Sequence, residues 1–136
     1  MRDYGEAMQE AREKAGLSRA KLAEKIGVDM RCVLEHETGG STPLLSYCIK
    51  CADALHISID EFVGRTHKPA WVYAKPYEWR VSFELSQREL AARAGIHLST
   101  LQAVERMKRD PMILSVELCA DALGLGIDEY IKHEVK

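Results

Sequence analysis

Residues 17–37 read LSRAKLAEKIGVDMRCVLEHE, and residues 85–105 read LSQRELAARAGIHLSTLQAVE. The two stretches lie 68 positions apart. The same offset aligns residues 17–61 with 85–129 without a gap, with 15 of 45 positions identical. In each copy apolar residues recur at helical spacing up to a glycine, Gly27 or Gly95, and resume after a short turn. The chain is therefore a tandem repeat, and its unit contains two helices joined by a tight turn.

Further signals extend each unit to five helices. Ala7, Met8, Ala11 and Ala15 predict a first helix over residues 4–15, and Ser18 has the chemistry of an N-cap for the second. Asp29 caps a third helix at Met30–Glu37, Pro43 suits the first turn of a fourth, and Ser58 with Glu61 predicts a capping box for a fifth.

The second unit repeats this plan, with a short first helix over 77–84 and a capping box of Ser86 with Glu89. The region 65–76 contains two prolines, which oppose a continuous helix and predict an extended linker. We therefore predict an all-α protein of two tandem five-helix domains, 1–64 and 77–136.

The composition argues against several classes of protein. The 136 residues carry 19 Lys and Arg against 21 Asp and Glu, and a net charge of −2 argues against a non-specific polyanion binder. No apolar run reaches membrane-spanning length and no signal peptide opens the chain, which predicts a cytoplasmic protein without membrane contact. In that compartment the four cysteines are expected to be thiols.

Both quoted stretches are followed by a polar loop, a proline and the sequence CADAL. With these motifs the chain resembles the lambda-repressor/Cro-like helix-turn-helix family, the XRE-type regulators, twice over nearly its whole length. The resemblance implies a five-helix fold and sequence-specific binding of double-stranded DNA in transcriptional regulation. It also implies an ion pair between the first helix and the end of the third, here Arg12 with Glu37 and Arg80 with Glu105, which we interpret as structural.

Only the outward face of a recognition helix, near its N-terminus, can reach base edges in the major groove. The expected base contacts are Met30, Arg31, Leu34 and Glu35 in the first unit and Leu98, Ser99, Gln102 and Ala103 in the second. Of these, Arg31 can bond guanine and Gln102 can bond adenine.

Phosphate contacts are expected at the start of the second helix and in the loop after the third. The residues are Arg19, Thr38 and Ser41 in the first unit and Ser86, Gln87, Arg106, Lys108 and Arg109 in the second. Residues 17–43 carry four positive and four negative charges, whereas 85–111 carry five and three. The charge difference favours the second unit as the stronger DNA binder.

Other chemistry has weaker support. Cys48 and Cys51 spell C-x-x-C, but Cys51 and Cys119 share one repeat position on an inner helix face, which favours core packing over zinc or redox function. His36 stands where the repeat has Val104 and is expected to be a partly buried neutral histidine. A thiol sensor at Cys32 is disfavoured, because that position faces the second helix. We predict no catalytic residues, metal or cofactor, and no enzyme.

The interpretation is a DNA-binding regulator, a repressor rather than an activator, that reads adjacent half-sites with its two units. The alternative is a protein-interaction or antitoxin-like module in which only the second unit binds DNA. Trp71, Tyr73, Tyr77 and Trp79 cluster near the linker. They are expected to pack the linker onto the units, or else to form a surface for a homodimer or partner protein.

Overall fold

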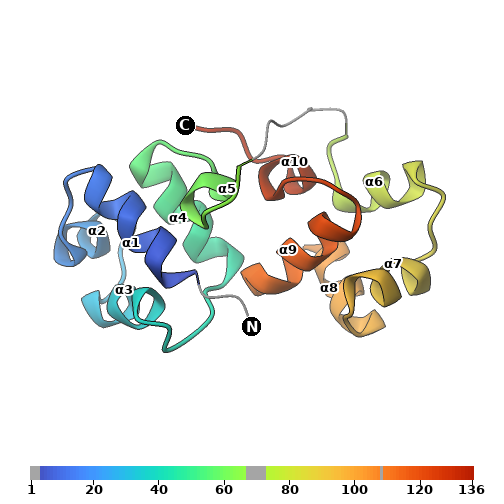
Figure 1. Cartoon of the computed structure of the whole chain (residues 1–136), viewed down its shortest axis with the longest axis horizontal. Helices are drawn as coiled ribbons and strands as arrows, with labels where there is room; N and C mark the ends of the chain where they lie inside the picture. The colour runs from blue at the N-terminus through green and yellow to red at the C-terminus, as the bar shows by residue number, and fades with distance from the viewer. Residues whose placement is uncertain (1–3, 67–72, 108) are drawn as a thin grey trace. The chain divides into compact units, whose positions relative to one another are not determined.

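The computed structural model describes residues 4–66, 73–107 and 109–136, and the regular elements in these ranges are α-helices (Figure 1). The chain divides into two compact units: unit 1 comprises Met1–Thr66 with Val135–Lys136, and unit 2 comprises His67–Glu134. The all-α tandem architecture predicted from the repeat is confirmed. Lys108 and the linker residues 67–72, including Trp71, lie outside the described ranges.

Unit 1 is built from five helices: α1 (Gly5–Lys14), α2 (Arg19–Ile26), α3 (Met30–Glu37), α4 (Leu45–Leu55) and α5 (Ile59–Phe62). Helix α2 packs against α3 and α4, while α1 contacts α3 and α5. Met8, Leu22, Val33, Cys51 and Phe62 contribute to the buried core, and each is almost inaccessible to solvent. The stripe predicted for α1 is only partly buried, because Ala15 is its exposed C-cap.

Unit 2 repeats the plan with α6 (Pro76–Ser82), α7 (Gln87–Ala94), α8 (Leu98–Arg106), α9 (Ile113–Ala122) and α10 (Ile127–Ile131). Helix α7 packs on α8 and α9, and α10 contacts α9 and α6. Pro76, expected at the end of the linker, is already the first residue of α6, a position that requires no N–H donor.

The expected caps are present at several helix starts. Ser18 accepts a hydrogen bond from the Lys21 N–H, and the Asp29 carboxylate accepts one from the Arg31 N–H. Ser86 and Glu89 bond reciprocally in a capping box. Pro43, however, lies outside the first turn of α4, because Leu44 keeps an extended backbone as N-cap and the helix begins at Leu45.

The two backbones make the same left-handed turns. Each described residue with positive φ has a partner, also with positive φ, 68 positions away. The five pairs are Gly16/Glu84, Gly27/Gly95, Gly39/Met107, His56/Gly124 and Gly64/Lys132. At Gly27 and Gly95, φ is 73° and 70°, and a Cβ would meet no atom within 4 Å. Backbone conformation rather than crowding therefore favours glycine there.

Candidate nucleic-acid interface

Each unit holds two consecutive helices joined by a tight turn, as the repeat predicted. Gly27 ends α2 and Asp29 starts α3 two residues later; Gly95 ends α7, and His97 stands before α8. Val33 of α3 and Leu101 of α8 are fully buried and fix the inner face of each second helix. The opposite face of that helix is thereby turned to solvent.

The outward face of α8 brings together three of the base contacts and two of the phosphate contacts expected in unit 2. A pocket of about 300 Å³ is lined by Ser99, Gln102, Ala103, Arg106 and Arg109. Leu98, the remaining expected base contact, is half-buried. A hydroxyl and an amide thus lie beside two guanidinium groups, a combination that can bond base edges and phosphate oxygens together.

The outward face of α3 has a different character. Its expected base contacts Met30, Arg31, Leu34 and Glu35 are all exposed, with Met30 at 48% and Leu34 at 37%. Two of the four side chains are apolar, and the charges of the other two oppose each other. This face offers a guanidinium to a base but little net attraction to phosphate.

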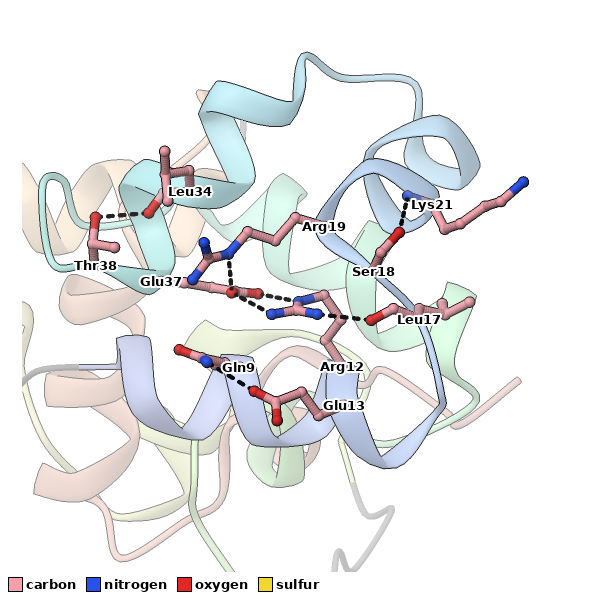
Figure 2. A network of polar contacts seen from close by, with 10 residues as sticks. All are labelled: Gln9, Arg12, Glu13, Leu17, Ser18, Arg19, Lys21, Leu34, Glu37 and Thr38. Atoms are coloured by element: carbon pink, nitrogen blue, oxygen red, sulfur yellow. Dashed lines mark hydrogen bonds and ion pairs between the residues drawn. The ribbon is translucent and has the colours of Figure 1, made fainter.

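A buried cluster in unit 1 ties α1, α2 and α3 together (Figure 2). Arg12 donates from Nε to Glu37 Oε2 at 2.7 Å and from Nη2 to Glu37 Oε1 at 2.9 Å, and its Nη1 donates to the Leu17 carbonyl. Arg19 Nε donates to the same Glu37 Oε1 at 2.9 Å. The structure therefore places Arg19, expected at phosphate, against Glu37.

Two guanidinium groups control the charge of Glu37. Burial alone would raise the pKa of this carboxyl, but hydrogen bonds and positive charge from Arg12 and Arg19 lower the pKa below its ordinary value. The hydrogen bond to Glu37 in turn raises the pKa of Arg12, against the effect of burial. The cluster is consequently an ion triad at neutral pH.

Unit 2 replaces the second guanidinium by a neutral amide. Arg80 Nε donates to Glu105 Oε2 at 2.7 Å and Arg80 Nη1 donates to the Leu85 carbonyl, as in unit 1. At the position of Arg19, Gln87 donates from Nε2 to Glu105 Oε1 at 3.1 Å. Gln102 Nε2 then donates to Gln87 Oε1 at 3.4 Å. The expected phosphate contact Gln87 and base contact Gln102 are thus bonded to one another.

The hydroxyls expected at phosphate have partners inside the protein. Thr38 Oγ1 donates to the Leu34 carbonyl at 2.7 Å, Ser41 Oγ lies 3.1 Å from His36 Nδ1, and Ser86 Oγ accepts from the Glu89 N–H. Arg106, the last residue of α8, and Arg109, in the loop that follows, are exposed guanidinium groups. The cationic loop therefore belongs to unit 2.

Three of the four cysteines are buried in the protein, and His36 packs against another side chain. Cys48, Cys51 and Cys119 are buried thiols, and burial raises the pKa of Cys51 to about 12. In the described part of the chain, no group of three or more histidine, cysteine or acidic residues is placed to hold a metal. His36 is half-buried, and its ring centroid lies 4.3 Å from that of Tyr47.

The aromatic cluster near the linker divides between core and surface. Trp79 is buried and meets Tyr73 edge to face, with ring centroids 4.9 Å apart. Tyr77 is 43% exposed and lines a groove of about 260 Å³ with Tyr73, Glu78, Val81 and Ser82.

Sequence reasoning missed the shared hydrogen bonds at Glu37 and Glu105. A usable signal was present: Arg19 and Gln87 each open the second helix of their unit and stand 18 residues before the glutamate. A polar side chain at that position can reach the carboxylate that the resemblance had already assigned to an ion pair.

Comparison with known proteins agrees with this geometry. The helix-turn-helix family model matches the chain twice, over residues 8–62 and 77–130. The cryptic phage CTXphi transcriptional repressor RstR of Vibrio cholerae serotype O1 is 35% identical over 60 residues, which are 44% of this chain and 54% of that protein. The chain thus aligns with about half the length of this relative. No solved structure matches the chain. Across the described ranges, every helix is too short or too polar to cross a membrane.

Proposed function

The chain belongs to the helix-turn-helix family, and we propose that it is a DNA-binding transcriptional repressor that reads two unequal half-sites of one duplex. The double family match supports one DNA-reading unit in each half of the chain. Similarity to a phage transcriptional repressor supports the direction of regulation. A repressor of this design acts by occupying its operator and needs no catalytic step.

The observation that carries the proposal is the pocket on α8. Ser99 in the first turn of α8 and Gln102 about one turn later offer hydrogen bonds to base edges, and Arg106 with Arg109 offers paired donors to the adjacent phosphates. The two kinds of contact are needed together, because phosphate contacts set the register in which bases are read.

Unit 1 is proposed as the weaker reader. Arg31 on its exposed α3 face is suited to guanine, but Arg19 is paired with Glu37 and residues 38–41 of the following loop carry no charge. A linker of about a dozen residues spans roughly 40 Å when extended. That reach allows two recognition helices to lie one DNA turn apart, about 34 Å.

Selection of bound sequences from a random duplex pool, followed by footprinting of the full chain, tests this proposal. Two half-sites of unequal affinity are expected on one face of the duplex. Gln102→Ala should relax base preference in the stronger half, and Arg31→Ala should do so in the weaker half. Failure of the full chain to enrich any sequence would refute DNA reading.

A second candidate concerns unit 1 alone. Exposure of Met30 and Leu34 on one face of α3, beside a loop without charge, also fits a protein-binding platform, as in an antitoxin-like module. In that case only unit 2 binds DNA. A footprint of one half-site that Arg31→Ala leaves unchanged would favour this function for unit 1.

A further inference from the structure

A chain of hydrogen bonds in unit 2 links the inner ion pair to the DNA-facing surface of α8. Glu105 holds Arg80 through one oxygen and Gln87 through the other, and Gln87 holds Gln102. Glu105 is bonded to α6 and α7, whereas Gln102 lines the α8 pocket. The orientation of Gln102, the side chain expected to contact a base, therefore depends on hydrogen bonds to residues of the other helices.

The orientation of both amides follows from what each group can donate or accept. A carboxylate only accepts hydrogen bonds, so Gln87 must turn its NH₂ group toward Glu105 and its carbonyl oxygen toward Gln102. Gln102 must then turn its NH₂ group toward Gln87. Rotating either amide by half a turn would set two acceptors or two donors against each other.

We propose that Gln87 is a positioning residue that presets Gln102 to select adenine over guanine. This inference rests on the proposed function. With one N–H directed at Gln87, Gln102 keeps its carbonyl oxygen and a second N–H for the groove. Adenine presents a matching donor at N6 and acceptor at N7, whereas guanine presents two acceptors, N7 and O6. The chain of hydrogen bonds from Glu105 through Gln87 to Gln102, called the relay below, disfavours the reversed amide. The reversed amide would offer its NH₂ group to those two acceptors.

The relay is specific to unit 2. At the corresponding positions unit 1 has Arg19, which donates to Glu37, and Leu34, which has no amide to orient. The Gln102–Gln87 distance of 3.4 Å is at the long end for a hydrogen bond. Because Gln102 uses an N–H in this bond, its carbonyl oxygen remains available to a base.

The test compares full-length variants against a random duplex pool. Gln87→Met keeps the length of the side chain and removes both polar groups. It should lower the preference for adenine over guanine at one base pair about fivefold or more, as should Gln102→Ala. The double variant should show no further loss, because both changes remove the same interaction. Gln9→Met, the same replacement at a half-buried position on α1 of unit 1, serves as the control and should leave the preference unchanged.

If Gln87 instead binds phosphate, Gln87→Met weakens binding to all sequences equally, and the relay is refuted. Unchanged adenine preference refutes it as well. Gln87→Ala provides a second variant if the first unfolds, which thermal melting reports.

A readout without DNA separates the relay from the proposed function. The side-chain amide resonances of Gln102 in the free protein should shift in Gln87→Met and stay in place in Gln9→Met. If the wild type enriches no DNA sequence, the proposed function fails, and these resonances alone decide the relay. Resonances that do not respond to Gln87→Met overturn it.

Discussion

Arg12 Nε lies 2.7 Å from Glu37 Oε2, and the two side chains are only 8% and 1% exposed. The matching pair in unit 2, Arg80 and Glu105, has the same separation but is 14% and 5% exposed. Removing one partner of a buried pair strands the other, so Glu37→Gln should destabilise unit 1 by about 3 kcal/mol. Glu105→Gln should cost less, because Glu105 holds one guanidinium and one neutral amide. Urea unfolding with residue-resolved NMR measures both, and equal losses of stability would contradict this expectation.

Acid should destabilise unit 1 through the same carboxylate. The pKa of Glu37 is lower in the folded than in the unfolded chain, so its stabilising contribution is present above the unfolded pKa of about 4.3. That contribution is lost as the pH falls through the lower, folded pKa. The stability difference between wild type and Glu37→Gln should therefore be constant near neutral pH and shrink below about pH 4. Unfolding free energies measured across this range check the sign, and a gap that widens in acid would contradict it.

Buried thiols should resist labelling. Burial raises the pKa of Cys51 and of Cys119 to about 12, so both are protonated at about pH 8 as well as shielded from solvent. A thiol reagent should modify them only after the addition of denaturant, and chelators should leave the melting curve unchanged. Half-buried Cys32 is the internal comparison and should react first. Zinc bound in stoichiometric amount to the purified protein would overturn the assignment to the core.

The cationic loop of unit 2 should govern the salt dependence of DNA binding. Replacing Arg106, Lys108 or Arg109 by alanine should weaken binding to all sequences and reduce the logarithmic salt slope by up to about 1 for each phosphate that is no longer neutralised. Lys14→Ala, in the α1–α5 groove of unit 1, removes the same charge elsewhere and is the control. A triple variant with an unchanged salt slope would exclude this loop from the interface.

Met107 holds a left-handed conformation, with φ of 53°, where the other repeat has Gly39. Such a conformation costs a non-glycine residue roughly 1 kcal/mol. Met107 is 40% exposed, so its side chain contributes little burial. Met107→Gly should therefore leave stability equal or raise it by up to about 1 kcal/mol, after the added flexibility of the unfolded chain is counted. Gly95→Ala, at a φ of 70°, should lower stability. Thermal melting of the two variants tests whether only Gly95→Ala lowers stability. A strong loss of stability in Met107→Gly would contradict the prediction.

Local signals account for most of the fold. Asp29 and Glu37 bound α3 as predicted, because a side-chain cap and the end of an apolar period are both encoded within a few residues. Pro43 shows the limit of such signals, since a proline restricts the backbone without deciding which following residue becomes the N-cap.

The site was less predictable from sequence. Helical phase suffices to place Ser99 and Gln102 on the outward face of α8. The partners of Arg19 and Gln87 depend on a carboxylate 18 residues away on another helix, and these side chains were assigned to phosphate because both stand at a helix start. A polar side chain can bond either another residue of the protein or a ligand. Which of the two it bonds depends on distances between helices, and sequence periodicity does not give those distances.

The five pairs of left-handed residues have a practical meaning for redesign. Because the left-handed turns occur at a constant offset of 68 residues, the two backbones match, and side chains at corresponding positions can be exchanged between the units. Transplanting glutamine to positions 19 and 34, the counterparts of Gln87 and Gln102, would ask whether the reading properties of one half move with its side chains. Unit 2 thus supplies the side chains for this exchange, and unit 1 supplies the backbone that receives them.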